Sequence, residues 1–220
     1  MIRWRCQAAV LALLLVALTG CAHAISGTAT WPGARLDKVV LTAADFPPGV
    51  QYDRITPTPG RRGGGPPAML SSPEGCSDGL TRAITDSAER GPGSAGEYLV
   101  SYDGARIVMT VLTSPLDLAR LAATADRCAH FQTFFDPSAP GIPMTTIRLQ
   151  PPRPDALAYQ QTMRLNNVDS SAYFAFANIG RMGVFGIAFP TPNPSIAVKA
   201  ALPQTFLDIV VKQADRAQSP

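Results

Sequence analysis

Two stretches of alternating apolar and polar residues in the middle of the chain predict a β-hairpin. They cover residues 97–102 and 105–113, and the Asp103-Gly104 pair between them has the turn chemistry that matches the twist of paired strands. Four later stretches are rich in β-branched and aromatic residues, and they predict further strands of which the last two pair around a turn. These strands are expected over residues 145–149, 157–165, 171–177 and 182–189.

The last predicted strand contains two glycines, Gly183 and Gly186, which weaken a strand interior. By the period of two, Gly183 shares one face of the strand with Phe185, Ile187 and Phe189. The glycines indicate a bulge, which we prefer, a close approach of another backbone, or room for a ligand on the sheet.

Apolar residues at three- and four-residue steps predict three helices. The first is expected within residues 69–90. The second begins at Ser114 as its N-cap and carries Cys128 on its buried face, and the third covers residues 203–216. This order of elements predicts an α+β fold in which helices pack on one face of an antiparallel β-sheet.

The first residues of the chain have the pattern of a signal peptide. Arg3 and Arg5 precede 11 consecutive apolar residues at 8–18. This run is too short for a helix that crosses the roughly 30 Å apolar core of a bilayer, which needs about 20 residues. Residues 1–20 are therefore expected to direct export and not to span the membrane.

The apolar run leads into Leu18-Thr19-Gly20-Cys21, which resembles the lipobox of bacterial lipoproteins. The resemblance implies that the Cys21 thiol receives acyl chains such as palmitate and that the chain is cleaved just before this residue. Several acyl chains anchor a protein stably where one is marginal. This interpretation places the protein on the extracytoplasmic face of the cell membrane. The alternative is an ordinary signal peptide whose cleavage site neighbours a cysteine.

Periodicity divides the mature chain into a tether and one domain. Residues 21–38 show little periodicity and are expected to form a flexible tether behind the lipidated cysteine. A single globular domain is expected over residues 39–220, which is long enough to bury one core. Within it, residues 56–67 are rich in Pro and Gly and predict a solvated loop, with a recognition segment as the alternative.

Cysteine usage predicts one disulfide. Cys6 leaves with the signal peptide and Cys21 carries lipid, so Cys76 and Cys128 remain. An oxidising compartment outside the cytoplasm favours their pairing. A reactive or metal-binding pair is the alternative, but the chain has only two histidines and no C-x-x-C spacing. We therefore expect a structural Cys76–Cys128 bridge and no metal site.

Composition argues against several classes of function. The chain has 19 Lys and Arg against 16 Asp and Glu, with no basic cluster beyond Arg61-Arg62, which is not typical of nucleic-acid binding. His130 is expected as a partly buried structural residue on the second helix, with ligand contact or catalysis as alternatives, because no nearby Ser or Asp completes a triad. Common catalytic and phosphate-binding motifs do not occur. We expect neither an enzyme nor a bound cofactor.

Several features together resemble actinobacterial surface lipoproteins of the mycobacterial type. They are the lipobox, the opening Leu41-Thr42-x-x-Asp45-Phe46-Pro47-x-Gly49, the cysteine in the helix after the hairpin, and the strand-rich second half. More loosely, residues 38–216 resemble the PknH-like extracellular sensor domain of mycobacterial kinases. That domain usually carries two disulfides, whereas this chain can form one.

Two functions follow from these expectations. The first is an envelope lipoprotein that presents a sensor-like or ligand-binding domain to a small molecule, a lipid or a protein. The alternative is a lipid or glycolipid carrier whose sheet wraps an apolar cavity. A carrier needs many hundreds of cubic ångströms of apolar space, whereas a sensor cleft is smaller and has convergent polar groups. The sequence identifies no ligand-binding residues.

Overall fold

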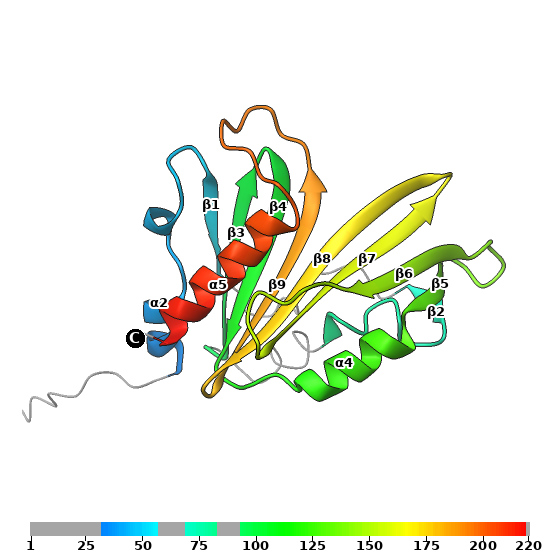
Figure 1. The fold of residues 1–220 in the computed structure, drawn as a ribbon, viewed down its shortest axis with the longest axis horizontal. Coiled ribbons are helices and arrows are strands. Elements are labelled where there is room, and N and C mark those ends of the chain that lie inside the picture. Colours follow the sequence, from blue (N-terminus) through cyan, green and yellow to red (C-terminus); the bar gives the residue numbers. More distant parts are fainter. Residues whose placement is uncertain (1–31, 57–68, 83–92, 219–220) are drawn as a thin grey trace, which may run out of the picture. The chain divides into compact units, whose positions relative to one another are not determined.

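A computed structural model describes residues 32–56, 69–82 and 93–218. Nine β-strands form one antiparallel sheet in the order β1-β3-β4-β9-β8-β7-β6-β5-β2 (Figure 1). They are β1 (Gln51–Ile55), β2 (Leu70–Ser72), β3 (Ala95–Tyr102), β4 (Gly104–Leu112), β5 (His130–Phe134), β6 (Ile142–Arg148), β7 (Ala156–Leu165), β8 (Val168–Ile179) and β9 (Met182–Thr191). The antiparallel sheet and the α+β class are confirmed.

Two-residue turns account for the strand connections in the centre of the sheet. The predicted hairpin is confirmed as β3 and β4, where Tyr102 pairs with Ala105 and Gly104 has a φ of +95°. The predicted pairing of β8 with β9 is also confirmed, with Gly180 in the turn. Asn166 and Asn167 both have positive φ and connect β7 to β8. The central strands are therefore specified by short-range turn chemistry.

The described helices are α2 (Pro32–Val39), the short 3-10 helix η1 (Ala43–Asp45), α4 (Leu118–Arg127) and α5 (Gln204–Gln218). Helices α2 and α5 pack on the same core, in which Leu36 and Phe206 are fully buried. Helix α4 belongs to a different core, which contains Leu121 and Phe176. The helices thus cover both faces of the sheet, and the prediction that they pack on one face is wrong.

The inner halves of β7 and β8 explain why both faces are covered. Successive residues of a strand point to opposite faces, and here four consecutive residues of each strand are buried. On β8, Phe174 and Phe176 belong to the core under α4, whereas Ala175 and Ala177 belong to the core under α5. Because both sets are apolar, each face gains stability only when other elements exclude water from it.

Two predicted boundaries need correction, and others lie outside the described residues. Helix α2 occupies residues 32–39 and buries Leu36, so the predicted tether over residues 21–38 is too long. The predicted helix over residues 69–90 begins instead with strand β2. Residues 1–31, most of the predicted 56–67 loop, and residues 83–92 lie outside the described part of the chain.

The Leu41–Gly49 motif joins the start of the fold to its C-terminal helix. The backbone N–H and the hydroxyl of Thr42 donate to Asp45 Oδ2 at 2.7 and 3.0 Å. On α5, Arg216 Nη2 lies 2.5 Å from Asp45 Oδ1, and Lys212 donates to the Asp45 carbonyl. Gly49 has a φ of +92°, where glycine is favoured. These positions of the motif therefore have a structural role.

Candidate ligand-binding groove

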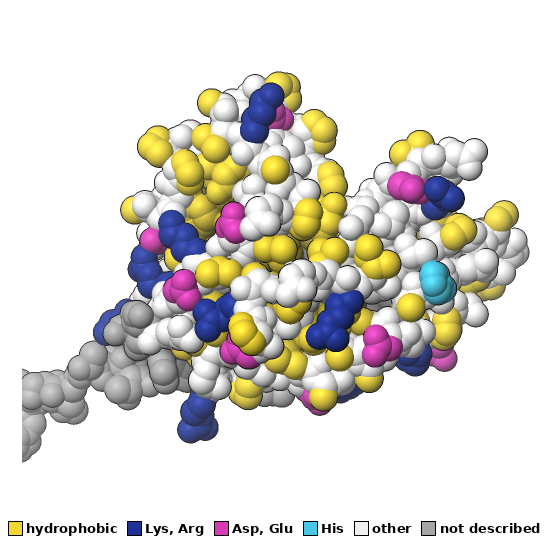
Figure 2. All heavy atoms as spheres, viewed as in Figure 1, with side chains coloured by type: hydrophobic (Ala, Val, Ile, Leu, Met, Phe, Trp, Pro, Cys, Tyr) yellow, Lys and Arg dark blue, Asp and Glu magenta, His cyan; other side chains and the backbone are white. Residues whose placement is uncertain are grey.

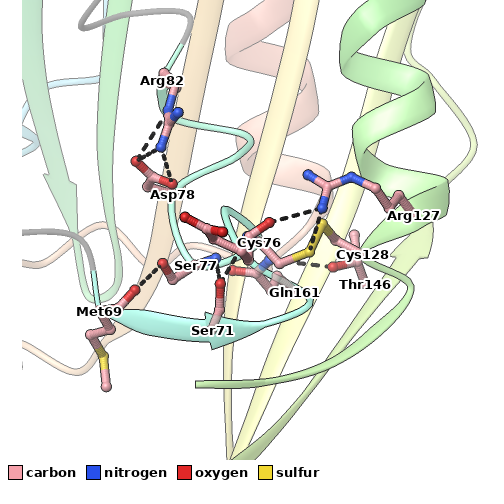
Figure 3. The surroundings of a disulfide bond; sticks show 11 residues. Met69, Ser71, Cys76, Ser77, Asp78, Arg82, Arg127, Cys128, Thr146 and Gln161 are labelled. Carbon is pink, nitrogen blue, oxygen red and sulfur yellow. Dashed lines mark hydrogen bonds and ion pairs between the residues drawn. A yellow bond between two sulfur atoms is a disulfide. The ribbon is translucent and has the colours of Figure 1, made fainter. Parts of the chain in front are cut away.

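The disulfide Cys76–Cys128 joins the loop after β2 to the end of α4 (Figure 3). Its S–S distance is 2.03 Å, and both cysteines are 2% exposed. Phe131 and Met144 pack against it on the same face of the sheet as α4. The predicted pairing is confirmed, and the bridge fixes a loop of irregular structure against a helix.

Hydrogen bonds hold the loop after β2 from both sides (Figure 3). The Ser71 hydroxyl oxygen on β2 accepts from the backbone N–H groups of Cys76 and Ser77 at 3.0 and 3.3 Å. On the other side, Arg127 Nη1 of α4 donates to the carbonyl of Glu74 at 2.9 Å. Because these contacts satisfy polar groups of the loop, its conformation is defined although it contains no regular structure.

A groove of about 860 Å³ lies between this loop and α4. The loop approaches the helix closely, since a Cβ atom on Gly79 would lie 2.7 Å from Cγ2 of Thr124. Apolar side chains on its described walls include those of Met69, Pro115, Leu116 and Leu121. The charged residues that line it are Glu74, Asp78, Asp117, Arg82, Arg120 and Arg127. The groove therefore combines apolar contact area with groups of both charges.

Some of these charged groups are engaged within the groove wall. Arg82 forms an ion pair with Asp78 at 2.8 Å, and Asp117 caps α4 by accepting from the backbone N–H of Arg120 at 2.9 Å. The side chains of Glu74 and Arg120 have no hydrogen bond or ion pair with any described residue. The groove thus offers one carboxylate and one guanidinium to a polar ligand.

Other predicted residues lie differently from expectation. His130 is not on a helix or partly buried: α4 ends at Arg127, and His130 is the exposed first residue of β5. Ser114 does not cap the helix, because Asp117 takes that position and α4 begins at Leu118. Cys21 lies outside the described residues. Of the predicted site residues, the structure brings together only the two disulfide cysteines.

No sequence pattern identifies the residues that line the groove. Arg120 and Glu74 lie in polar surface segments with no motif, so their pattern is the same as that of solvated residues. The run of Ser, Pro, Glu and Gly around Cys76 was the available signal, since it is typical of an irregular loop. Only the bridge to α4 shows that this loop forms one wall of a groove.

Within the described ranges, no three His, Cys, Asp or Glu side chains are placed to hold a metal ion. No helix in this part of the chain has the length and apolar character that crossing a membrane requires.

Comparison with known proteins finds similarity to a solved structure. No family model matches the chain, and no curated protein sequence matches it. The X-ray structure of an uncharacterised protein from Mycobacterium smegmatis, the Rv0999 ortholog, is similar with 15% sequence identity and a TM-score of 0.48. The match covers 84% of this chain and 94% of that one. That protein comes from a mycobacterium, and the resemblance of this chain to the PknH-like sensor domain stays a hypothesis.

Proposed function

We propose that the protein is an exported, acyl-anchored lipoprotein of the cell envelope that presents a ligand-binding or sensor-like domain. The observation that carries the proposal is the groove of about 860 Å³, with Glu74 and Arg120 on walls that a disulfide holds together. Pockets with a few convergent polar groups on a rigid frame are typical ligand sites.

Two further observations support an envelope location. The Cys76–Cys128 bridge fits an oxidising compartment, because the reducing cytosol disfavours structural disulfides. The Leu18–Cys21 sequence resembles a lipobox, and lipidation of Cys21 would attach the domain to the membrane. The PknH-like resemblance favours a role in sensing the ligand of the groove.

The lining of the groove favours a polar ligand over a long-chain lipid. Its volume of about 860 Å³ would suffice for a carrier, but six charged residues lie on its described walls. Burying an acyl chain there would remove water from these groups without giving them new partners, which is unfavourable. The lipid or glycolipid carrier therefore ranks second.

The first prediction concerns the anchor. Cys21→Ala should abolish acylation and leave uncleaved or mislocalised precursor, because the thiol is the attachment point that the proposal assigns. Mass spectrometry of the full chain extracted from membranes measures this directly. A Cys21→Ala protein that still carries acyl chains would contradict the anchoring proposal.

The second prediction concerns the groove. Arg120→Gln should lower the occupancy of a polar small molecule that co-purifies with the full chain, by about tenfold for the loss of a charged hydrogen bond. Lys38→Gln is the matched control, since it removes one positive charge from α2 on the opposite face of the sheet. Native mass spectrometry compares the parent with both variants. Equal occupancy in all three would refute the groove, and a long-chain lipid in the parent would favour the carrier.

A further inference from the structure

Strands β8 and β9 separate part-way along their length (Figure 1). Their pairing runs from Ile179 and Met182 to Tyr173 and Ala188, where it stops. Beyond that point, residues 168–172 of β8 pair with β7 alone, while residues 189–191 of β9 pair with β4 alone. We call the space between the two diverging strands the fork.

Two prolines explain why the pairing stops. If the register of β8 and β9 continued, Ser171 would lie opposite Pro190, and Asp169 would lie opposite Pro192. Proline has no N–H group to donate and its ring does not fit inside a sheet. Because antiparallel strands exchange hydrogen bonds at every second residue, the prolines occupy the successive positions that would have to bond to β8. The sequence of β9 therefore holds the fork open.

The register also determines which backbone groups of β8 face the fork. The turns Asn166-Asn167 and Gly180-Arg181 each contain two residues, so Leu165 with Val168 and Ile179 with Met182 are the hydrogen-bonded closing pairs. Along an antiparallel strand, successive residues direct their backbone N–H and C=O groups to opposite sides. Counting from either closing pair, residues 169, 171 and 173 direct these groups away from β7. Tyr173 is paired with β9, but Asp169 and Ser171 have no strand partner on this side among the described residues.

The side chains along this edge are already engaged with β7. The Ser171 hydroxyl lies 3.0 Å from Oγ1 of Thr162 and accepts from Nε2 of Gln160 at 3.0 Å. The Asp169 carboxylate pairs with Arg164 at 2.9 Å. What the edge offers to a partner is thus a short ladder of backbone donors and acceptors without a net charge.

The other free edges of the described sheet carry features that prevent pairing. The outer strand β1 contains Asp53 and Arg54, and β2 has three residues and is followed by Pro73. The free edge of β9 has Pro190. Natural sheets protect edges with charge, short strands and proline. The edge at residues 168–172 has neither a proline nor a free charge, because Arg164 pairs with its one charged residue, Asp169.

We propose that the fork binds an extended peptide segment of a partner protein, which adds to β8 as a strand beside Asp169 and Ser171. A peptide supplies alternating N–H and C=O groups at the spacing that this edge requires. Val168 and Phe189, which are 67% and 40% exposed, flank the fork on one face of the sheet and would contact apolar side chains of the peptide. The proposal does not depend on the groove beside α4.

The position of the edge favours a single peptide over a second copy of the protein. Figure 2 shows the surface hollowed between the arm formed by β7 and β8 and the neighbouring part of the domain. The edge of a second copy would lie in an equivalent recess, so two folded copies would clash before their β8 edges could pair. One extended chain avoids this clash.

The test uses synthetic peptides selected with the full chain from a phage-displayed library of random octapeptides. In the free protein, the amide hydrogens of Asp169 and Ser171 should exchange rapidly with deuterium, and a bound peptide should protect them. Ser171→Pro should weaken binding at least about tenfold, because it removes the N–H that faces the fork. Ser171→Ala is the matched control, since it keeps that N–H and should bind like the parent.

The double variant Pro190→Thr with Pro192→Thr tests the cause of the fork. It restores the missing donors, so β9 should pair with β8, protect both amides without peptide and exclude the peptide. Failure to select any peptide, protection confined to other strands, or unchanged binding by Ser171→Pro would each overturn the proposal. Amides already protected in the free parent would also overturn it, because the fork would then be occupied by the chain itself.

Discussion

Gly183 and Gly186 show how single residues determine the packing on the two faces of β9. Both lie in uninterrupted ladders with β4 and β8, so the predicted bulge is wrong. A Cβ atom on Gly183 would lie 2.9 Å from the carbonyl oxygen of Ser114, and one on Gly186 would lie 2.7 Å from the Phe206 ring. Gly183 therefore accommodates the close approach of another backbone segment, whereas Gly186 accommodates the side chains of Met109 and Phe206.

These contacts predict that two similar substitutions each destabilise the protein. Gly183→Ala should lower the free energy of unfolding by about 1–3 kcal/mol, because the new methyl group meets backbone that cannot move away. Gly186→Ala should also lower it, because the Met109 side chain at 2.7 Å can shift but the fully buried Phe206 ring at the same distance cannot shift freely. Chemical denaturation of both variants measures the two effects. A Gly183→Ala protein as stable as the parent would contradict the packing described here.

At the scale of elements, the disulfide connects the irregular loop after β2 to the end of α4. Its two cysteines are 52 residues apart in the sequence. The loop contributes few regular hydrogen bonds, and its contacts with Arg127 are partly exposed. The covalent bond is therefore expected to be important for keeping the two walls of the groove together.

Breaking the disulfide should destabilise the protein as a whole. Cys76→Ser should lower the thermal midpoint and should leave Cys128 open to alkylation. The free energy of unfolding should fall by at most about 4 kcal/mol, the chain-entropy estimate for a loop of this length. The double variant Cys76→Ser with Cys128→Ser is the control, because it should unfold like the single variant while having no reactive thiol at this position. Two free thiols in the purified parent together with an unchanged midpoint would refute the bridge.

At the scale of the whole molecule, the start of the fold is attached to its last helix. Gln213 of α5 is fully buried, donates to the carbonyl of Val39 at 2.8 Å and accepts from the N–H of Leu41 at 3.2 Å. Asp45 adds an ion pair with Arg216. Both contacts span more than 170 residues, so they form only when the sheet has brought the two ends together.

The ionisation of Asp45 makes this attachment dependent on pH. Burial alone would raise the pKa of Asp45, but hydrogen bonds from Thr42 and the charges of Arg216 and Lys212 together lower it below the ordinary value of 3.8. The carboxylate therefore stabilises the fold above that value, and this contribution is lost as the pH falls through the lower folded-state pKa.

Asp45→Asn should accordingly destabilise the protein by about 1–2 kcal/mol at neutral pH. The difference from the parent should shrink below about pH 4, where the parent carboxylate is protonated in the unfolded and then in the folded state. Denaturation curves at several pH values provide the measurement. Asp37→Asn, at an exposed pair with Arg54, should change stability little. A constant difference at all pH values would argue against the electrostatic explanation.

The sequence alone determined the features that depend on neighbouring residues. The Asp103-Gly104 turn, the period of two in β7 to β9 and the apolar stripe of α5 are local, because turn chemistry and side-chain direction act over a few residues. The pairing of Cys76 with Cys128 followed from the small number of cysteines. The disulfide that joins the two walls of the groove was thus predictable, whereas the residues that line the groove were not.

Only the tertiary structure decided which surfaces these elements share. That α4 and α5 cover opposite faces follows from the burial of both faces of β7 and β8, which periodicity alone does not show. Helix α2 is part of the fold because Leu36 reaches a core made by distant strands. The groove and the fork arise where segments far apart in the chain come together or fail to pair. The register that brings Pro190 opposite Ser171 is a relation between two strands, and no single stretch of sequence contains it.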